Sequence, residues 1–524
     1  MSFDNRIHKN LRHDLPAGLV VFLVALPLCL GIALASGAPL FSGIIAGILG
    51  GLVVPILSRS QLAVSGPAAG LTAIVLAGIK DMGSFEQFLV AVFLGGVIQF
   101  GLGLIRAGKI AYFFPVSVIK GMLAAIGIIL IINQFPHLFG YNVAQYQQDR
   151  VRLPEAQSFE QMKQVFLANL QLGAIVISVV SLGILILWEN TRLKKINWMP
   201  GALVVVVVSV LINLYFKQSP DWVLFALAND HLVSIPGFSF EDPTAALRFP
   251  DFSALSNGAT YTLAITIAVI ASLESLLTVE AVDKLDPFRR QSNMNKELLG
   301  QGLANSLSGL IGGLPITCVI VRSSVSIESG GRTRMVAISH GVLLLVSVLF
   351  LGDVLNQIPL ACLSAILLLV GYKLAHPSKF ITVYRRGMDQ FIPFMTTILA
   401  ILFTDLLTGV IIGIAFGLVF VIIVDFKAAI DIERPEPKRY LIVMNKDVSF
   451  LNKFVLRQAL DKVENSSHVH IDARRAKFID QDIIEVINDF KAAAPNRNIT
   501  LTCKDLTKER FSLNLFREQN ERNN

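Results

Sequence analysis

Charged residues are scarce in this sequence. They make up 16% of the chain, whereas a soluble globular protein has about 25%. Hydrophobic residues reach 53%, and the mean hydropathy is +0.63. The charges thin out between about Leu15 and Val424 and crowd together after Asp425. This distribution predicts a membrane domain followed by a smaller soluble domain.

Residues that carry enzymatic chemistry are also few. The chain has four cysteines, and no two of them have the spacing of metal ligands. Three lie in apolar segments, which is typical of small buried side chains and not of a disulfide framework. The eight histidines are scattered and form no cluster with nearby carboxylates. We therefore expect neither an enzyme nor a bound cofactor.

The positive net charge does not predict a nucleic-acid-binding protein here. The charge is +7, which in a soluble protein would suggest nucleic acid. Cytoplasmic loops of membrane proteins are rich in Lys and Arg, and that explanation fits this composition better. No small-residue cleavage motif follows the first apolar stretch, so we expect a permanent span and not a signal peptide.

Long apolar stretches are abundant. A spanning helix needs about 20 apolar residues, and fewer if it is broken. The sequence predicts fourteen spans, of which the third and the tenth are short. They lie near residues 15–35, 41–58, 66–80, 86–106, 112–133, 169–188, 199–216, 260–282, 297–313, 321–330, 335–351, 358–374, 390–404 and 407–425.

Lys and Arg residues in the loops predict the orientation. If Arg6, Lys9 and Arg12 are cytoplasmic, alternation places most other basic loops in the cytoplasm and the mildly acidic loop 217–258 outside. The loop 134–168, which also falls outside, carries basic residues and fits less well. We expect a multi-pass protein of the cytoplasmic membrane with both termini in the cytoplasm.

Two stretches have the pattern of broken helices. The Gly66-Pro67 step interrupts a helix, so a short helix should begin there after an extended lead-in. Pro315 precedes a β-branched run, and a second short helix should begin near Val321–Ser323 and end at Gly330. In the predicted orientation both N-termini point at the bilayer midplane, as in inverted-repeat transporters, where such helix ends hold an anion.

Glu274 is the unusual residue of the span 260–282. The residues from 273 to 279 are apolar apart from Glu274, Ser275, and Thr278. A carboxylate in such a place is costly unless it is paired, hydrated or protonated, so we predict a polar cavity there and not a helix end. Thr278 lies one turn on, on the same face. The pair could coordinate Na⁺, or Glu274 could carry a proton.

Arg322 falls at the start of the second short helix. Arg332 and Arg334 already occupy the interface about ten residues on, so Arg322 is expected near mid-depth and not at the membrane surface. A cation beside a helix N-terminus makes an anion site, and small side chains let the anion approach the backbone. The predicted substrate-binding residues are Ser65, Gly66, Ala68, Ala69, Ile320, Val321, Arg322 and Ser323.

Several of these stretches resemble the SulP family of anion transporters, which includes sulfate carriers, cyanobacterial bicarbonate transporters and prestin. The most specific are "NKELLGQGLANSLSGLIGGLP" (295–315) and "VRSSVSIESGGRTR" (321–334); "VSGPAAGLTAIV" (64–75) and "ESLLTVEAVDK" (274–284) also match. The resemblance implies two inverted repeats of seven segments, about 15–216 and 260–425. It further implies a core domain that moves against a gate domain, with the anion between the third and tenth segments.

The resemblance also implies roles for individual residues. Arg322 matches the family's Arg at the start of the tenth segment. Glu274 matches an acidic position that is Asp in bicarbonate carriers using Na⁺ and Glu in many proton-coupled members, and Thr278 matches a Na⁺-site hydroxyl. Two departures remove a hydroxyl: Val321 stands where prestin-like members have Ser, and Ala68 where bicarbonate carriers can have Thr. Backbone amides must then do more of the binding.

The tail is expected to form a separate domain. After an N-terminal segment 1–14 and the transport domain 15–425, we predict a linker at 426–438 and an α/β domain at 439–524. Its strands and amphipathic helices resemble a STAS domain. The stretch 480–482 has no Ser where bacterial regulators of that fold are phosphorylated. We expect the domain to be cytoplasmic and to favour a homodimer.

The sequence thus predicts an α-helical membrane protein with a small α/β domain. Its predicted function is secondary transport of a small inorganic oxyanion, bicarbonate or sulfate first, coupled to Na⁺ or H⁺. The alternatives are an anion channel or exchanger without cation coupling, and a nucleobase-type symporter. Glu274 argues against the first alternative, and Arg322 with the STAS-like tail argues against the second.

Overall fold

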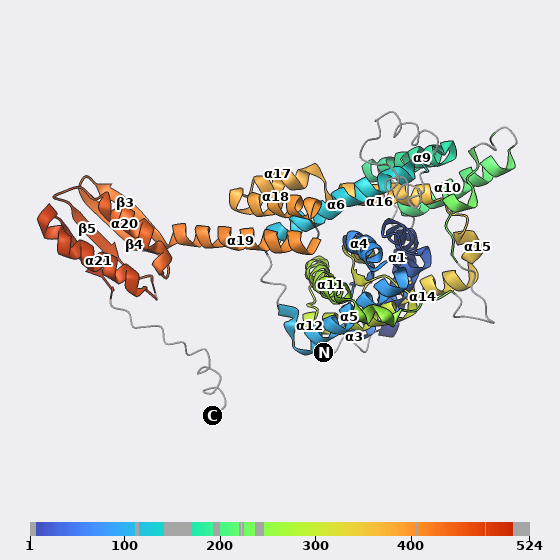
Figure 1. The fold of residues 1–524 in the computed structure, drawn as a ribbon, viewed down its shortest axis with the longest axis horizontal. Coiled ribbons are helices and arrows are strands. Elements are labelled where there is room, and N and C mark those ends of the chain that lie inside the picture. Colours follow the sequence, from blue (N-terminus) through green and yellow to red (C-terminus); the bar gives the residue numbers. More distant parts are fainter. Residues whose placement is uncertain are drawn as a thin grey trace, which may run out of the picture. The chain divides into compact units, whose positions relative to one another are not determined.

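The computed structural model describes residues 7–109, 115–140, 170–191, 200–219, 222, 225–235, 246–404, 406–476 and 478–506. The chain divides into two compact units. One comprises Met1–Arg386 and Phe394–Ile414, and the other comprises Gly387–Pro393 and Ala415–Asn524. The first unit is helical (Figure 1).

Helices make up most of the described first half of the helical unit (Figure 1). They are α1 (Ile7–Ala35), α2 (Leu40–Leu52), α3 (Val54–Ser58), α4 (Thr72–Met82), α5 (Phe85–Leu104), α6 (Val116–Leu138), α9 (Leu172–Asn190) and α10 (Gly201–Gln218).

The second half repeats this density of helices. It contains α11 (Gly258–Leu285), α12 (Met294–Ile311), α13 (Ile320–Glu328), α14 (Met335–Phe350), α15 (Gly352–Leu355), α16 (Leu360–Leu374) and α17 (Pro377–Tyr384). The helices α18 (Met388–Phe403) and α19 (Leu406–Ala429) have residues in both units. Each of the fourteen predicted spans overlaps one of the helices in these two sets.

Many of these helices can cross a membrane. Within the described residues, eight are long and apolar enough, and three shorter apolar helices accompany them. By contrast, α4 and α13 have 11 and 9 residues, about half the length of a full crossing. The protein is therefore an α-helical membrane protein that contains two half-length helices, and the count of fourteen crossings stays a prediction.

Two short strands precede the half-length helices. Strand β1 (Ser65–Pro67) leads through a 3₁₀ turn at Ala69–Leu71 into α4, and β2 (Ile316–Cys318) leads directly into α13. They pair antiparallel, with Ser65 opposite Cys318. The first short helix begins later than predicted, since Ser65–Pro67 form β1 and α4 starts only at Thr72. The β-branched residues Ile316 and Thr317 favour extended chain. Because the strands are antiparallel, the two helices start from one crossing point and run in opposite directions.

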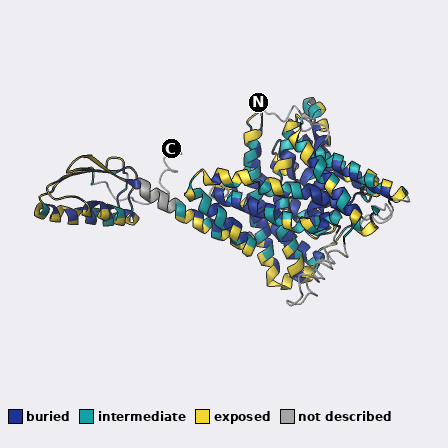
Figure 2. Cartoon of the chain, turned by 90° about the horizontal axis from the view of Figure 1, so that it is seen from above, coloured by how far each residue is buried: buried dark blue, intermediate teal, exposed yellow. Residues whose placement is uncertain are grey.

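The helices pack in two groups around this crossing. In one group, α1 packs on α2 and α14, and α5 packs on α11 and α12; in the other, α16 packs on α6 and α9. Figure 1 shows α6 and α16 running alongside each other. Figure 2 shows buried residues concentrated in the interior of the helical unit and exposed residues at its edge.

The C-terminal unit is a small α/β fold. Its sheet has the order β3-β4-β5-β6 (Ile430–Glu436, Arg439–Met444, His468–Asp472, Thr500–Lys504). The first pair is antiparallel and the other two are parallel. Helices α20 (Lys453–Asp461) and α21 (Gln481–Ala493) supply Leu456, Leu460 and Ile483 to its core. This unit is consistent with the predicted STAS domain.

The prediction of a linker at 426–438 was wrong. Residues 426–429 end α19, and 430–436 form β3, which pairs with β4. Ile430 is buried opposite Met444, while the charged residues of β3 face solvent. The charged residues of this stretch suggested a linker. Ile430 and Ile432 alternate with charged residues, however, and this pattern is compatible with an edge strand.

Candidate functional site

The site is built around the crossing of β1 and β2. The first N–H groups of a helix have no partner within that helix. At the start of α13 these belong to Ile320 and Val321, and beside the 3₁₀ turn they belong to Ala69 and Gly70. Two sets of backbone donors and two positive helix ends thus lie near one point, which favours a bound anion.

A cavity of about 130 Å3 opens at this point. It gathers both predicted coupling residues and most of the predicted substrate-binding residues. Apolar side chains of α1, α6 and α16 complete the wall. The predicted residues that line it are Ala68, Ala69, Ile320, Val321, Arg322, Glu274 and Thr278.

Arg322 is the cation of the cavity. Its side chain is fully buried, and its Nη2 lies 3.4 Å from the Cys29 sulfur and 3.5 Å from the Pro67 carbonyl oxygen. Its Nε and Nη1 have no hydrogen-bond partner within the described part of the chain. Gly66 makes room for it, since a Cβ there would lie 2.1 Å from Nη1. The guanidinium therefore has donors left over for a ligand.

Glu274 is the carboxyl group of the cavity. Its Oε2 is buried and has no hydrogen-bond partner among the described residues. The carboxyl packs against Gly70, where an added Cβ would lie 2.6 Å from both oxygens. Because Gly66 has no side chain, the Arg322 guanidinium fits against it, and the Glu274 carboxyl fits against Gly70 in the same way. Both glycines lie on the same strand-to-helix turn. Thr278, one turn along α11, lines the same cavity.

Three predicted substrate-binding residues do not line the cavity. Gly66 packs on Arg322, as described. The Ser65 hydroxyl accepts a hydrogen bond from Gln301 Nε2 at 2.7 Å. The Ser323 hydroxyl accepts from the Val64 amide at 3.0 Å and donates to the Val319 carbonyl at 2.9 Å. These groups hold the two strand-to-helix turns together.

Sequence reasoning missed the polar residues that fix the strands. Asn305 accepts from the Ile316 amide at 2.6 Å and donates to the Ile316 carbonyl at 3.0 Å. The Ser275 hydroxyl accepts from the Cys318 amide at 3.1 Å. Gln301 and Asn305 are four residues apart and fully buried. Two amide side chains on one face of a helix in the membrane domain were the sequence signal that could have predicted these buried hydrogen bonds.

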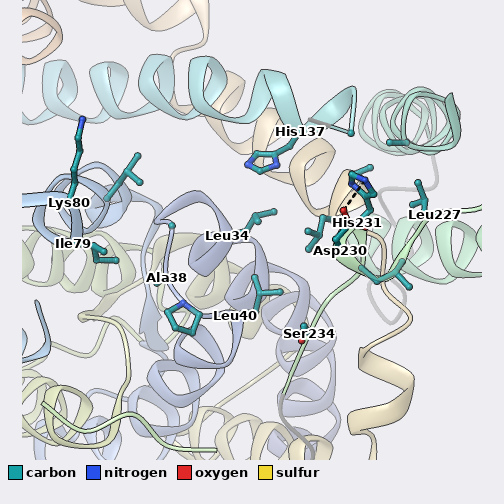
Figure 3. A pocket seen from close by; sticks show the side chains of 18 of the residues that line it. Leu34, Ala38, Leu40, Ile79, Lys80, His137, Leu227, Asp230, His231 and Ser234 are labelled. Atoms are coloured by element: carbon teal, nitrogen blue, oxygen red, sulfur yellow. Dashed lines mark ion pairs between the residues drawn. The ribbon is translucent and has the colours of Figure 1, made fainter. Parts of the chain in front are cut away.

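A second cavity, of about 680 Å3, has a different lining (Figure 3). It lies among α1, α4, α6, α16 and the segment 227–234, and shares no lining residue with the cavity at the crossing. Lys80, His137 and His231 face it, and His231 pairs with Asp230 at 3.5 Å. None of the predicted site residues lines it.

No group of three or more His, Cys, Asp or Glu side chains suited to a metal ion occurs in the described ranges. A carboxylate with a hydroxyl can serve Na⁺, which prefers oxygen ligands as other hard cations do. Glu274 and Thr278 fit that chemistry, and the unpartnered Oε2 fits a bound proton equally well.

Comparison with known proteins agrees with this architecture. The chain is 29% identical over 416 residues to the "Putative sulfate transporter YvdB" of Bacillus subtilis, covering 79% of this chain and 74% of that one. It is 29% identical over 380 residues to the "Bicarbonate transporter BicA" of Picosynechococcus, covering 71% and 63%.

Solved structures share the fold. The transmembrane domain of a cyanobacterial bicarbonate transporter BicA superposes with a TM-score of 0.63 at 24% identity, covering 80% of this chain and 98% of that one. The overall structure of SLC26A9 gives a TM-score of 0.72 at 16% identity, covering 95% and 84%. The fold is that of a multi-pass membrane domain followed by an α/β unit.

The sequence profile of the sulfate permease family matches residues 11–398. Because this is most of the chain, the protein belongs to that family, as the motifs at 295–315 and 321–334 predicted.

Proposed function

We propose that this protein is a secondary active transporter of a small inorganic oxyanion, sulfate or bicarbonate, and that a cation bound at Glu274 is co-transported. The single observation that carries the proposal is the meeting of Arg322, two helix starts and Glu274 around one cavity. The naming of relatives as sulfate and bicarbonate transporters supports the choice of anion.

Coupling follows from the charges around the cavity. Arg322 and the helix ends attract an anion, whereas an ionised Glu274 repels it. A proton or Na⁺ on Glu274 removes this repulsion, so cation and anion bind cooperatively. An anion that enters a negative cell alone works against about 2.3 kcal/mol per charge per 100 mV. A co-transported cation offsets that cost.

The packing of the cavity supports alternating access. One wall comes from the strand-to-helix turns and α11, and the other comes from apolar residues of α6 and α16, including Met122 and Leu367. We propose that the group containing α6 and α16 is the gate and that the group around the crossing is the core. Movement between them opens the cavity to either side of the cytoplasmic membrane, with both termini in the cytoplasm.

Uptake into proteoliposomes tests the proposal. Purified protein should accumulate radiolabelled sulfate or bicarbonate above its external concentration when a Na⁺ gradient or a proton gradient is imposed. Parallel reactions with each gradient alone identify the coupled ion. Passive equilibration that neither gradient can drive uphill would show an exchanger or channel instead.

A further inference from the structure

Glu297 on α12 is a second buried carboxyl group, outside the cavity. Its side chain is fully buried. Its Oε1 accepts from Gln301 Nε2 at 2.9 Å, and the Ser58 hydroxyl is another hydrogen-bond partner. Its Oε2 has no partner, and no ion pair to Glu297 occurs among the described residues. A carboxylate is costly in such surroundings unless a cation neutralises it.

Hydrogen bonds connect Glu297 to the strand crossing. The same Gln301 Nε2 donates to Ser65 at 2.7 Å, and Ser65 lies opposite Cys318 in the strand pair. The Gln301 Oε1 is also buried without a partner in the described structure. This cluster has more acceptors than donors. A proton on Glu297 would add the missing donor.

Four hydrogen-bonding contacts, one of them through a backbone amide, lead from Glu297 to the end of α11. Ser58 accepts from the Ser60 amide at 3.2 Å. The Ser60 and Ser292 hydroxyls are 2.6 Å apart, and Ser292 donates to Asp283 at 2.7 Å. Asp283 is partly exposed and lies next to Lys284 in the last turn of α11, at the end predicted to face the cytoplasm. Ser58 and Ser60 are both buried, so the path is lined by protein until it reaches Asp283.

We propose that Glu297 is a second proton-binding site of the transport cycle, which exchanges its proton with the cytoplasm through Ser58, Ser60, Ser292 and Asp283. The inference rests on the proposed function and assigns H⁺ as a coupled ion. A cytoplasmic proton enters at Asp283, and an O–H bond forms on Glu297 while the last donor hydroxyl is reprotonated behind it. Passage from Ser60 to Ser58 takes one side-chain rotation or one bridging water, because their direct contact uses an amide.

The charged surroundings fit proton storage. Asp283 of α11 lies within electrostatic reach of Glu297. The Cys318 thiol of β2 lies within electrostatic reach of Glu297, Glu274 and Asp283. Asp283 and Glu297 carry charge of the same sign when ionised, so protonation of Glu297 is favoured while Asp283 is ionised.

Infrared spectroscopy of the purified full-length protein tests the proton directly. At neutral pH the wild type should show a component of the C=O stretching band of protonated carboxyl groups that is lost in Glu297→Gln, while any component from Glu274 remains. In Ser60→Ala the band should remain, but its exchange from hydrogen to deuterium should slow by roughly tenfold, as expected when one relay group is lost. An identical carboxyl band in Glu297→Gln, or unchanged exchange in a folded Ser60→Ala, would overturn the proposal.

Transport gives a second readout that does not need Glu297→Gln to fold. The ratio of proton-driven uptake to anion exchange should fall roughly tenfold in Ser60→Ala and stay unchanged in Ser256→Ala, a control at an exposed 3₁₀ turn. Wild-type uptake driven by Na⁺ alone would refute this inference while leaving the proposed function in place. Absence of any anion uptake would refute the proposed function. The infrared band would then still show whether Glu297 carries a proton.

Discussion

Arg322 is the residue on which anion binding most depends. It is the buried cation of the cavity, with two donor atoms that have no partner in the described region. Arg322→Ala should lose a charge-assisted contact of about 1.5–3 kcal/mol, which is about ten- to a hundredfold in affinity. Radiolabelled uptake by purified protein measures the loss.

The matched control for this variant is Arg248→Ala, whose side chain is 64% exposed. It should bind and transport as the wild type does. Arg322→Lys should recover only part of the affinity, because a lysine lacks the fixed fork of donors. If folded Arg322→Ala transported like the wild type, the cation would not belong to the anion site.

Gly70 tests whether the Glu274 carboxyl must lie where it does. An alanine there would place a Cβ 2.6 Å from both carboxyl oxygens, so Glu274 would have to move. We expect Gly70→Ala to lose gradient-driven uptake by about tenfold or more, since an ångström-scale displacement at a functional group has effects of this order. Gly101→Ala, in a helix with open space around it, is the control and should transport normally.

Sequence patterns predicted the residues of the cavity but not the polar groups behind it. Arg322 and Glu274 were recognised because a charged side chain in an apolar membrane segment is energetically costly and therefore indicates a functional role. Glu297 did not, because an acidic residue in the first turn of a helix reads as an ordinary exposed N-terminal residue. Its burial comes from the packing of α12 on α5 and α3, which is tertiary and leaves no local pattern. Ser65 and Ser323 were likewise placed on the right turns, but packing directs their hydroxyls to other partners.

At the scale of elements, Asp14 fixes the start of α1 to the loop after α13. It is fully buried and accepts from the Arg332 amide at 2.7 Å, the Thr333 amide at 3.1 Å and the Thr333 hydroxyl at 2.5 Å. Asp14→Ala leaves these donors unpaired, so stability should fall by about 1–3 kcal/mol. Thermal unfolding in detergent, compared with exposed Asp353→Ala, measures the change; equal melting temperatures would contradict the role.

The half-length helices were the best-predicted elements. Gly66-Pro67 and Pro315 marked the two breaks. Gly66-Pro67 lies in β1 and Pro315 directly precedes β2, and these two strands pair with each other. The pairing itself had no sequence signal, because three-residue strands carry too little alternation. The strand β3 was missed for a different reason, since its charged residues concealed Ile430 and Ile432.

At the scale of the whole molecule, the C-terminal unit should fold in the absence of the helical unit. It has a core of its own, and β3 starts at Ile430. We expect a fragment of residues 430–524 to unfold cooperatively, to favour a dimer and to bind no sulfate. Calorimetry and analytical ultracentrifugation measure these properties. If the fragment bound sulfate with the affinity of the full chain, the anion site would lie in the C-terminal unit, which would contradict this prediction.

The central claim for the whole molecule is that Glu274 links two fluxes. Arg322 and the helix starts favour the anion, and the carboxyl makes anion binding depend on a cation. Glu274→Gln fixes the neutral form of this side chain. It should therefore still bind and exchange the anion but no longer respond to a cation gradient. Glu280→Gln, six residues along the same helix and ion-paired with Lys284 at its end, is the matched control.

Uphill uptake of radiolabelled sulfate or bicarbonate in proteoliposomes, under an imposed Na⁺ or H⁺ gradient, tests this claim most directly. The predicted result is accumulation by the wild type and Glu280→Gln, and anion exchange without accumulation by Glu274→Gln. Undiminished gradient-driven accumulation by Glu274→Gln would contradict the claim.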